Sequence, residues 1–205
     1  MPSQHDVSPD NPCPFLRALV ASGYVGGHIV PLGTLTEDIG LASGKTGGKL
    51  IGAKVAAYGI AMIANGHPLR SVSSGAILDD LRNGPLDKHG AGSRILGVDA
   101  NLHLDQIERF ASFGQDYANP DGGTERGLNA KQIETFMADN LKRAGDEARW
   151  YYPIMMKGEW PVLLDILGKG EGDARYLSVA EVRTLFVERR FPDRIVARLQ
   201  QTPAA

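Results

Sequence analysis

Cys13, the only cysteine of the chain, is the residue best placed to do chemistry. It lies in Asn11-Pro12-Cys13-Pro14, directly before an apolar pattern of helical period, so its sulfur should lie at a helix N-terminus. Unpaired backbone N–H groups and the positive end of the helix dipole point outward there and favour a thiolate. An unperturbed cysteine thiol has a pKa near ~8.5, and a helix N-terminus lowers it. We therefore expect Cys13 to act as a thiolate.

Two other roles for Cys13 stay open. A lone cysteine is often a buried structural residue, although the prolines on both sides restrict the backbone more than an apolar site needs. A catalytic nucleophile is the second alternative, and it would require a histidine base. No local context marks any of the five histidines as that base; they are His5, His28, His67, His89 and His103.

Length and composition favour one domain that binds a small molecule. The chain has 205 residues and a formal net charge of -2, with no basic stripe for nucleic acid and no polybasic cluster for a membrane surface. Residues 1–12 lack the pattern of a signal peptide, and the longest apolar stretch, 50–64, is interrupted by Lys54. We expect a soluble, cytoplasmic protein with a flexible segment 1–12 and one domain over 13–200. The oligomeric state is not indicated.

Helix signals dominate the pattern, which predicts a mainly α fold in a single compact helical domain. The first helix should cover 13–22 and stop at Gly23. A capping box of Thr34 and Glu37 should open a second helix, and Gly40 and Gly44 should weaken it. Further helices are predicted over 48–65, before Gly66, and over 74–82, capped by Ser74 and followed by a glycine-rich loop over 83–92.

A frame of leucine, polar cap and amphipathic helix occurs three times, over 102–110, 128–136 and 177–185. The irregular spacing argues against a solenoid and for one capping solution that is used repeatedly. The capping pairs are Asn129 with Gln132 and Ser178 with Glu181. The helix from Ala130 could run beyond Trp150 until Pro153 bends or ends it, and further helices are expected over 159–167 and 178–190.

The segment 11–25, NPCPFLRALVASGYV, resembles the signature of the haem-thiolate peroxidases, the chloroperoxidase and unspecific peroxygenase family. Three more segments, 86–114, 157–168 and 176–195, are similar to the middle region, the Gly-Glu segment and the closing helix of that family, in the same order. The resemblance implies haem b with Cys13 as its axial iron ligand and Pro14 beside it. It also implies an enzyme that uses hydrogen peroxide to oxidise or oxygenate small organic substrates.

Glu159 matches the family's distal acid–base glutamate, which would take a proton from the near oxygen of peroxide and return it to the far oxygen. Its apolar neighbours, including Trp160, would raise its pKa by desolvation. A surface glutamate at a helix start is the structural alternative. Aromatic residues that could line a haem or substrate pocket, or simply form the core, are Phe110, Phe113, Phe136, Tyr152 and Trp160.

The chain departs from the family at several matching positions. Gly97 replaces a glutamate that helps hold magnesium near a haem propionate, which leaves only Asp99 and Asn101 as oxygen ligands and speaks against the metal. Val98 replaces a histidine partner of the distal glutamate, and Tyr152 stands in the stretch where other members of the family carry an arginine shortly before that glutamate. Glu159 would therefore act alone, or with Arg94 or His103.

Two other functions remain as alternatives. One is a helical calcium-binding or regulatory module, suggested by the oxygen pairs Asp99/Asn101 and Asn119/Asp121, although neither has the full EF-hand spacing. The other is a haem-binding relative with impaired turnover, suggested by the altered middle region. Pocket shape, which the sequence does not give, would decide between oxygen insertion, one-electron oxidation and halogenation.

Overall fold

The computed structural model describes residues 6–63, 66, 68–85, 87–88, 91–119 and 122–200. The chain folds into two compact units. Unit 1 consists of Met1–Asp87 together with Arg189–Ala205, and unit 2 of Lys88–Glu188. The sequence of unit 2 is thus inserted into that of unit 1.

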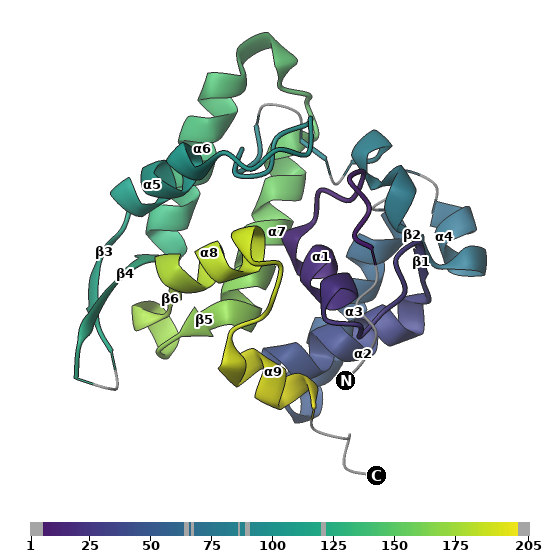
Figure 1. Ribbon diagram of the computed structural model, residues 1–205, viewed down its shortest axis with the longest axis horizontal. Helices are drawn as coiled ribbons and strands as arrows, with labels where there is room; N and C mark the ends of the chain where they lie inside the picture. Colours follow the sequence, from purple (N-terminus) through teal and green to yellow (C-terminus); the bar gives the residue numbers. More distant parts are fainter. Residues whose placement is uncertain are drawn as a thin grey trace. The chain divides into compact units, whose positions relative to one another are not determined.

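Unit 1 combines helices with a two-stranded antiparallel sheet, in which Ile29 pairs with Ile77 and Val30 with Ala76 (Figure 1). Its elements are α1 (Pro14–Ala21), β1 (Ile29–Val30), α2 (Leu32–Ser43), α3 (Gly47–Ile63), α4 (Pro68–Ser74), β2 (Ala76–Ile77), the 3₁₀ helix η1 (Leu78–Asn83) and α9 (Asp193–Leu199).

Local sequence explains the ends of the unit 1 helices. Pro14 takes the first position of α1, where a missing N–H is not needed, and Gly23 follows its end with a φ of 72°. Gly44 caps α2 in the left-handed region, with a φ of 64°. Gly75 joins α4 to β2 with a φ of 93°, and a Cβ there would lie only 2.5 Å from the carbonyl oxygen of Val30. This junction therefore requires glycine.

The segment 8–13, called the cysteine turn below, is hydrogen-bonded to the rest of unit 1. Arg17 donates to the carbonyl oxygens of Ser8 and Asn11, at 3.1 Å each. The side chain of Arg82 donates to the carbonyl of Pro9 at 2.9 Å, and its backbone N–H donates to the carbonyl of Asp10 at 3.1 Å. The chain just before Cys13 is thus held in place by two arginines.

Unit 2 contains a four-stranded antiparallel sheet in the order β3-β4-β6-β5. Its elements are α5 (Leu104–Ser112), β3 (Gln115–Ala118), β4 (Thr124–Asn129), α6 (Ala130–Ala144), the 3₁₀ helix η2 (Gly145–Glu147), α7 (Tyr152–Leu167), β5 (Gly168–Lys169), the 3₁₀ helix η3 (Gly172–Ala174), β6 (Tyr176–Ser178) and α8 (Val179–Val187). Figure 1 shows β3 and β4 as a hairpin that leads into α6.

Unit 2 is built from two copies of one motif, a helix followed by a hairpin and a second helix. The first copy is α5-β3-β4-α6 and the second is α7-β5-β6-α8, and β4 pairs with β6 so that Leu128 faces Leu177. Both predicted capping pairs of this region are confirmed: Asn129 and Gln132 form a full capping box, and the Ser178 hydroxyl accepts from the N–H of Glu181.

The prediction of a mainly α, single compact helical domain is wrong. The described residues form a mixed α/β structure with two small sheets. The strands escape detection because they are two to six residues long, too short for an alternating pattern to stand out. Leu128 and Leu177, the leucines that precede the polar caps in the repeated frame, lie in β4 and β6.

Three helix boundaries also differ from the prediction. Thr34 and Glu37 do not open a helix, because α2 already begins at Leu32, after Pro31. Ser74 ends α4 instead of capping a helix, since the positive φ of the next glycine turns the chain into β2. The helix from Ala130 ends at Ala144, before Gly145, and α7 is a separate helix.

Candidate functional site

Cys13 is the N-cap residue of α1, as its sequence context predicts. Its backbone is extended, with φ −81° and ψ 113°, and its N–H donates to the side-chain oxygen of Asn11 at 3.0 Å. Asn11 is fully buried, whereas Cys13 is half-buried. The sulfur therefore lies at the positive end of a helix dipole, on a turn with a fixed shape, where a ligand can still reach it.

Arg17 is the charged residue one helical turn after this cysteine, and nothing in the sequence indicates that it is buried. Its backbone N–H donates to the Cys13 carbonyl at 3.0 Å, so the two residues are one helical turn apart on the same face of α1. The Arg17 residue is only 4% exposed. Burial lowers the pKa of Arg17 to about 10, with further lowering by the positive Arg189 and Arg82, while the negative charge of Cys13 opposes the shift. At neutral pH Arg17 is a buried cation.

Glu159, the predicted acid–base residue, belongs to unit 2, whereas Cys13 belongs to unit 1. The backbone of Glu159 lies within α7, and its side chain falls outside the described part of the structure. The pairing of Cys13 with Glu159 across one haem therefore stays a prediction.

Phe110 and Trp160, predicted to bind the cofactor, are brought together in unit 2. Their rings stack with centroids 5.6 Å apart, and both contact Phe136 edge-on. Phe110 and Phe136 are fully buried and Trp160 is nearly so. These three rings form the aromatic core of unit 2, which is the structural alternative that the sequence had also allowed.

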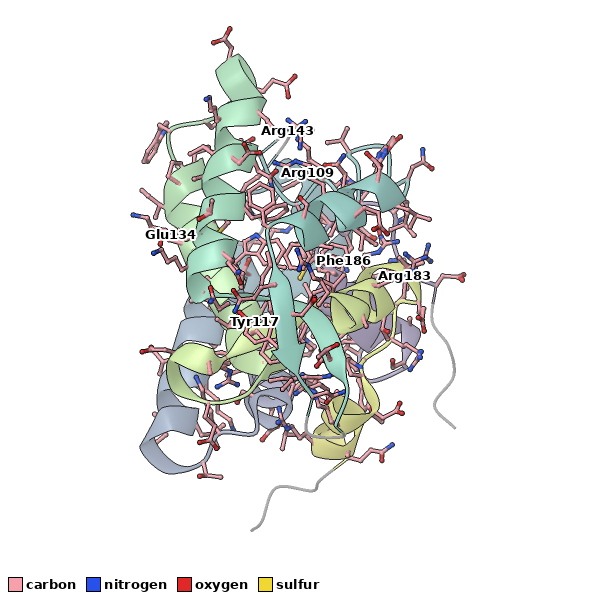
Figure 2. The ribbon with its side chains drawn as sticks, turned by 90° about the vertical axis from the view of Figure 1, so that its left-hand side faces the viewer. Arg109, Tyr117, Glu134, Arg143, Arg183 and Phe186 are labelled. Atoms are coloured by element: carbon pink, nitrogen blue, oxygen red, sulfur yellow. The ribbon has the colours of Figure 1, made fainter. Side chains whose placement is uncertain are left out.

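Arg109, on α5 and labelled in Figure 2, lies against two aromatic rings of unit 2. Its guanidinium lies 5.1 Å from the ring centre of Phe113 and 5.3 Å from that of Phe136. It also pairs with Asp139 and donates to the Asn140 side chain at 2.5 Å. All of these polar and aromatic partners of Arg109 belong to unit 2.

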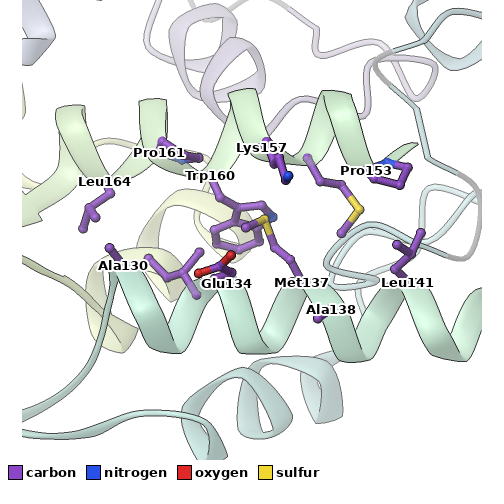
Figure 3. Close-up of a pocket in the computed structure, with 12 residues that line it drawn as sticks. Ala130, Glu134, Met137, Ala138, Leu141, Pro153, Lys157, Trp160, Pro161 and Leu164 are labelled. Atoms are coloured by element: carbon purple, nitrogen blue, oxygen red, sulfur yellow. The ribbon is translucent and has the colours of Figure 1, made fainter. Parts of the chain in front are cut away.

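A groove runs between α6 and α7 in unit 2, with a volume of about 390 Å³ (Figure 3). Met137 and Met156 lie on its opposite helices, and Trp160 contributes to its wall. Glu134 and Lys157 add one charge each. A mostly apolar groove of this size suits a small organic molecule.

The residues of the family's magnesium site do not form a cation site here. Asn101 donates to both carboxylate oxygens of Asp99, from its side chain at 2.7 Å and from its backbone at 3.1 Å. A Cβ at Gly97 would clash with an Asp99 carboxylate oxygen and with a ring nitrogen of His103, so these side chains fill the place of the missing glutamate. Asp99 and Asn101 therefore do not fit a magnesium ion.

The sequence also missed a polar network around Glu125 in β4. The Glu125 carboxylate accepts from Lys169 at 2.8 and 3.0 Å, from the Tyr176 hydroxyl at 2.7 Å and from the Ser178 hydroxyl at 2.7 Å. Lys169 also lies 3.5 Å from Glu181. The ammonium group of Lys169 thus bridges carboxylates from the two helix–hairpin–helix motifs.

This network bears on the calcium hypothesis. Lys169 occupies the place between Glu125 and Glu181 that a cation could take. Among the described residues, no three or more His, Cys, Asp or Glu side chains gather as metal ligands, and Asp121 lies outside those residues. Nothing in the described part of unit 2 favours calcium.

Within the described ranges no helix is long and apolar enough to cross a membrane. Neither a protein-family model nor a curated protein sequence matches this chain.

Proposed function

We propose that this protein is a haem-thiolate peroxygenase or peroxidase, which uses hydrogen peroxide to oxidise or oxygenate small organic molecules. The observation that carries the proposal is the setting of Cys13: a half-buried sulfur at the N-cap of α1, one turn from the buried cation Arg17. Helix dipole and guanidinium both favour a thiolate, which is the form of cysteine that binds iron.

The remaining roles follow from the same proposal. Haem ligated by a thiolate supplies O–O bond cleavage, because the sulfur pushes electron density toward the iron. Cys13 would hold the iron, and Pro14 would fix the backbone beside the sulfur. Glu159 would move the proton between the two peroxide oxygens through its carboxylate. The proposed function includes no magnesium ion, because the side chains of Asp99 and Asn101 do not form a site that suits one.

The substrate class rests on the groove between α6 and α7. Its volume of about 390 Å³ and its lining by Met137, Met156 and Trp160 suit apolar organic molecules rather than polar polymers. Met side chains adapt to irregular shapes, which favours a range of substrates over a single one.

The first experiment tests haem ligation. Protein purified with added haemin should be coloured, and its reduced carbon monoxide complex should show the red-shifted Soret band of a thiolate ligand. Cys13→Ser should lose that band, whereas Ser22→Ala, at the other end of α1, should keep it. A colourless wild type that takes up no haemin would refute the proposal, as would a Cys13→Ser variant with an unchanged spectrum.

The second experiment tests turnover. Glu159→Gln should slow peroxide-dependent oxidation of a phenol about 100-fold, the usual contribution of a general acid–base group. Glu171→Gln, which changes an exposed glutamate of the same unit, serves as the control and should keep the wild-type rate. Equal rates for Glu159→Gln and wild type, with the haem bound, would remove Glu159 from the mechanism.

A further inference from the structure

We propose that unit 2 binds an anionic lipid surface through the connection between α6 and α7. The side chains of Trp150 and Ile154, called the apolar tip below, would enter the headgroup layer. The inference goes beyond the proposed function, and its test depends neither on haem nor on turnover.

The apolar tip consists of two large side chains that the fold leaves in water. Trp150 is 84% exposed and Ile154 is 64% exposed. The chain between them turns helically, because α7 begins at Tyr152 and the N–H of Met155 already donates to the Tyr151 carbonyl at 3.1 Å. Residues four positions apart on such a turn lie on the same side, so Trp150 and Ile154 form one patch.

Apolar surface continues from the tip into the groove of unit 2. Leu141 of α6 and Pro153 of α7 line the groove at the end nearest the connection, and Pro153 directly precedes Ile154 (Figure 3). Ala130 and Leu164 line its opposite end. The apolar tip is therefore the outer end of a longer apolar surface between the two helices.

Basic side chains flank the apolar tip on both sides along the chain. The exposed ones are Lys142, Arg143, Arg149 and Lys157. No ion pair among the described residues uses Lys142, Arg149 or Lys157. The connection also carries two exposed acidic residues, Asp146 and Glu147, which leave the cations in excess. Anionic headgroups attract lysine and arginine side chains that are held near them, so the charge of this surface is complementary to an anionic bilayer.

A lipid surface suits the apolar tip better than a second protein does. A stable protein interface needs roughly 800 Å² on each partner, whereas one aromatic side chain buries at most about 250 Å². The two side chains of the apolar tip fall short of that area. A bilayer needs no complementary shape, and an indole ring beside basic residues is the combination that favours the headgroup layer.

The experiment measures co-sedimentation of the full chain, at neutral pH and low salt, with vesicles of phosphatidylcholine and phosphatidylglycerol in roughly equal amounts. Wild type should bind these vesicles and should bind pure phosphatidylcholine vesicles much more weakly. Trp150→Ala should weaken binding about tenfold, because the larger apolar group is lost. Arg149→Gln and Lys157→Gln should each weaken it about fivefold.

The matched controls change the same kinds of side chain elsewhere. Ile51→Ala, in α3, removes an apolar side chain that is 65% exposed and should bind like wild type, whereas Ile154→Ala should bind about threefold more weakly. Lys131→Gln removes an exposed lysine at the opposite end of α6 and should also bind like wild type. All of these variants should keep the wild-type Tm, since the side chains are exposed.

The fluorescence of Trp150 shows where unit 2 meets the vesicle. Trp160 is only 4% exposed and should keep its emission spectrum. A blue shift on adding the anionic vesicles therefore reports that Trp150 leaves water, and Trp150→Ala should show no shift.

The proposal would be overturned by a wild type that does not co-sediment with the anionic vesicles, or by a Trp150→Ala variant that binds like wild type. An equal loss in Lys131→Gln and Arg149→Gln would overturn it as well, because the attraction would then be diffuse. A wild type that is dimeric without lipid, with Trp150→Ala monomeric, would assign the apolar tip to a second copy of the chain instead. A colourless protein that binds the vesicles would refute haem ligation and leave the lipid contact supported.

Discussion

Replacing Glu125 by glutamine tests whether the Glu125 network holds the two motifs of unit 2 together. The carboxylate is 15% exposed and accepts four hydrogen bonds, two of them from an ammonium group that is 21% exposed. Glutamine keeps the shape but turns one acceptor into a donor that faces Lys169. Since a hydrogen bond to a charged group contributes about 1.5–3 kcal/mol, and an unpaired, mostly buried charge adds to the loss, Glu125→Gln should destabilise unit 2 by about 3 kcal/mol.

The stability loss caused by Glu125→Gln should also depend on pH. Desolvation raises the pKa of Glu125, but hydrogen bonds from Lys169, Ser178 and Tyr176 outweigh it and hold the pKa below its ordinary value of 4.5. A carboxylate whose pKa is lowered by folding stabilises the protein above its unfolded-state pKa and loses that effect as the pH falls through its folded-state pKa. The difference in the free energy of unfolding between wild type and Glu125→Gln should therefore be complete at pH 7 and should decrease progressively below pH 4.5.

The assay can follow unit 2 alone, because both tryptophans of the chain, Trp150 and Trp160, lie in it. Trp160 is buried at 4% exposure, so its fluorescence should change on urea unfolding. Glu134→Gln changes an exposed glutamate of α6 and should shift stability by less than about 0.5 kcal/mol. The role of the network would be refuted if Glu125→Gln were as stable as this control. It would also be refuted if Glu125→Gln were less stable than wild type by the same amount at pH 7 and at pH 3.

Two further predictions concern unit 1. Burial raises the pKa of Asp38 from 3.8 to about 6, and the negative charge of Glu37 contributes to the same shift. The Oδ2 atom of Asp38 is buried and has no hydrogen-bond partner among the described residues. Because the folded-state pKa is the higher one, ionisation destabilises the fold as the pH rises from 4 through 6. Asp38→Asn should therefore be more stable than wild type by about 1 kcal/mol at pH 8, after allowing for solvent screening of a half-exposed group, and no more stable at pH 4. Thermal melts at the two pH values test this prediction. An equal difference in stability between Asp38→Asn and wild type at both pH values would contradict it. Gly75→Ala should lower stability by about 3 kcal/mol through its φ of 93° and the clash with the Val30 carbonyl, whereas Gly47→Ala, with a φ of 58° and open space around it, should lower it by about 1 kcal/mol. Equal losses in circular dichroism melts would show that the clash does not matter.

The features that could be predicted from the sequence are local ones. Pro14 after the cysteine, Gly23 after α1 and the capping box of Asn129 with Gln132 each depend on residues a few positions apart. Such pairs make their contacts within one turn, so their spacing alone identifies them. The N-cap position of Cys13 belongs to this class.

The features that escaped prediction depend on contacts between distant segments. Lys169 contacts Glu125 from 44 positions away, and Leu128 pairs with Leu177 in two strands that the sequence pattern did not indicate. The burial of Arg17 is hidden for another reason, since arginine is among the residues least often buried and nothing in CPFLR distinguishes it. The repeated frame of leucine, cap and helix does mark structure, because it lies where β4 ends and α6 begins and where β6 ends and α8 begins.

The insertion of unit 2 into the sequence of unit 1 sets an order of events during synthesis. Residues 88–188 leave the ribosome before α9, so unit 2 can fold while unit 1 still lacks its last helix. The ring of Phe15, two residues after Cys13, packs against Phe191 with centroids 5.1 Å apart, and Arg198 reaches the Ala42 carbonyl from 156 positions away. The packing beside the cysteine turn thus forms late, and a nascent chain stopped before residue 189 should carry a folded unit 2 beside an unfinished cysteine site.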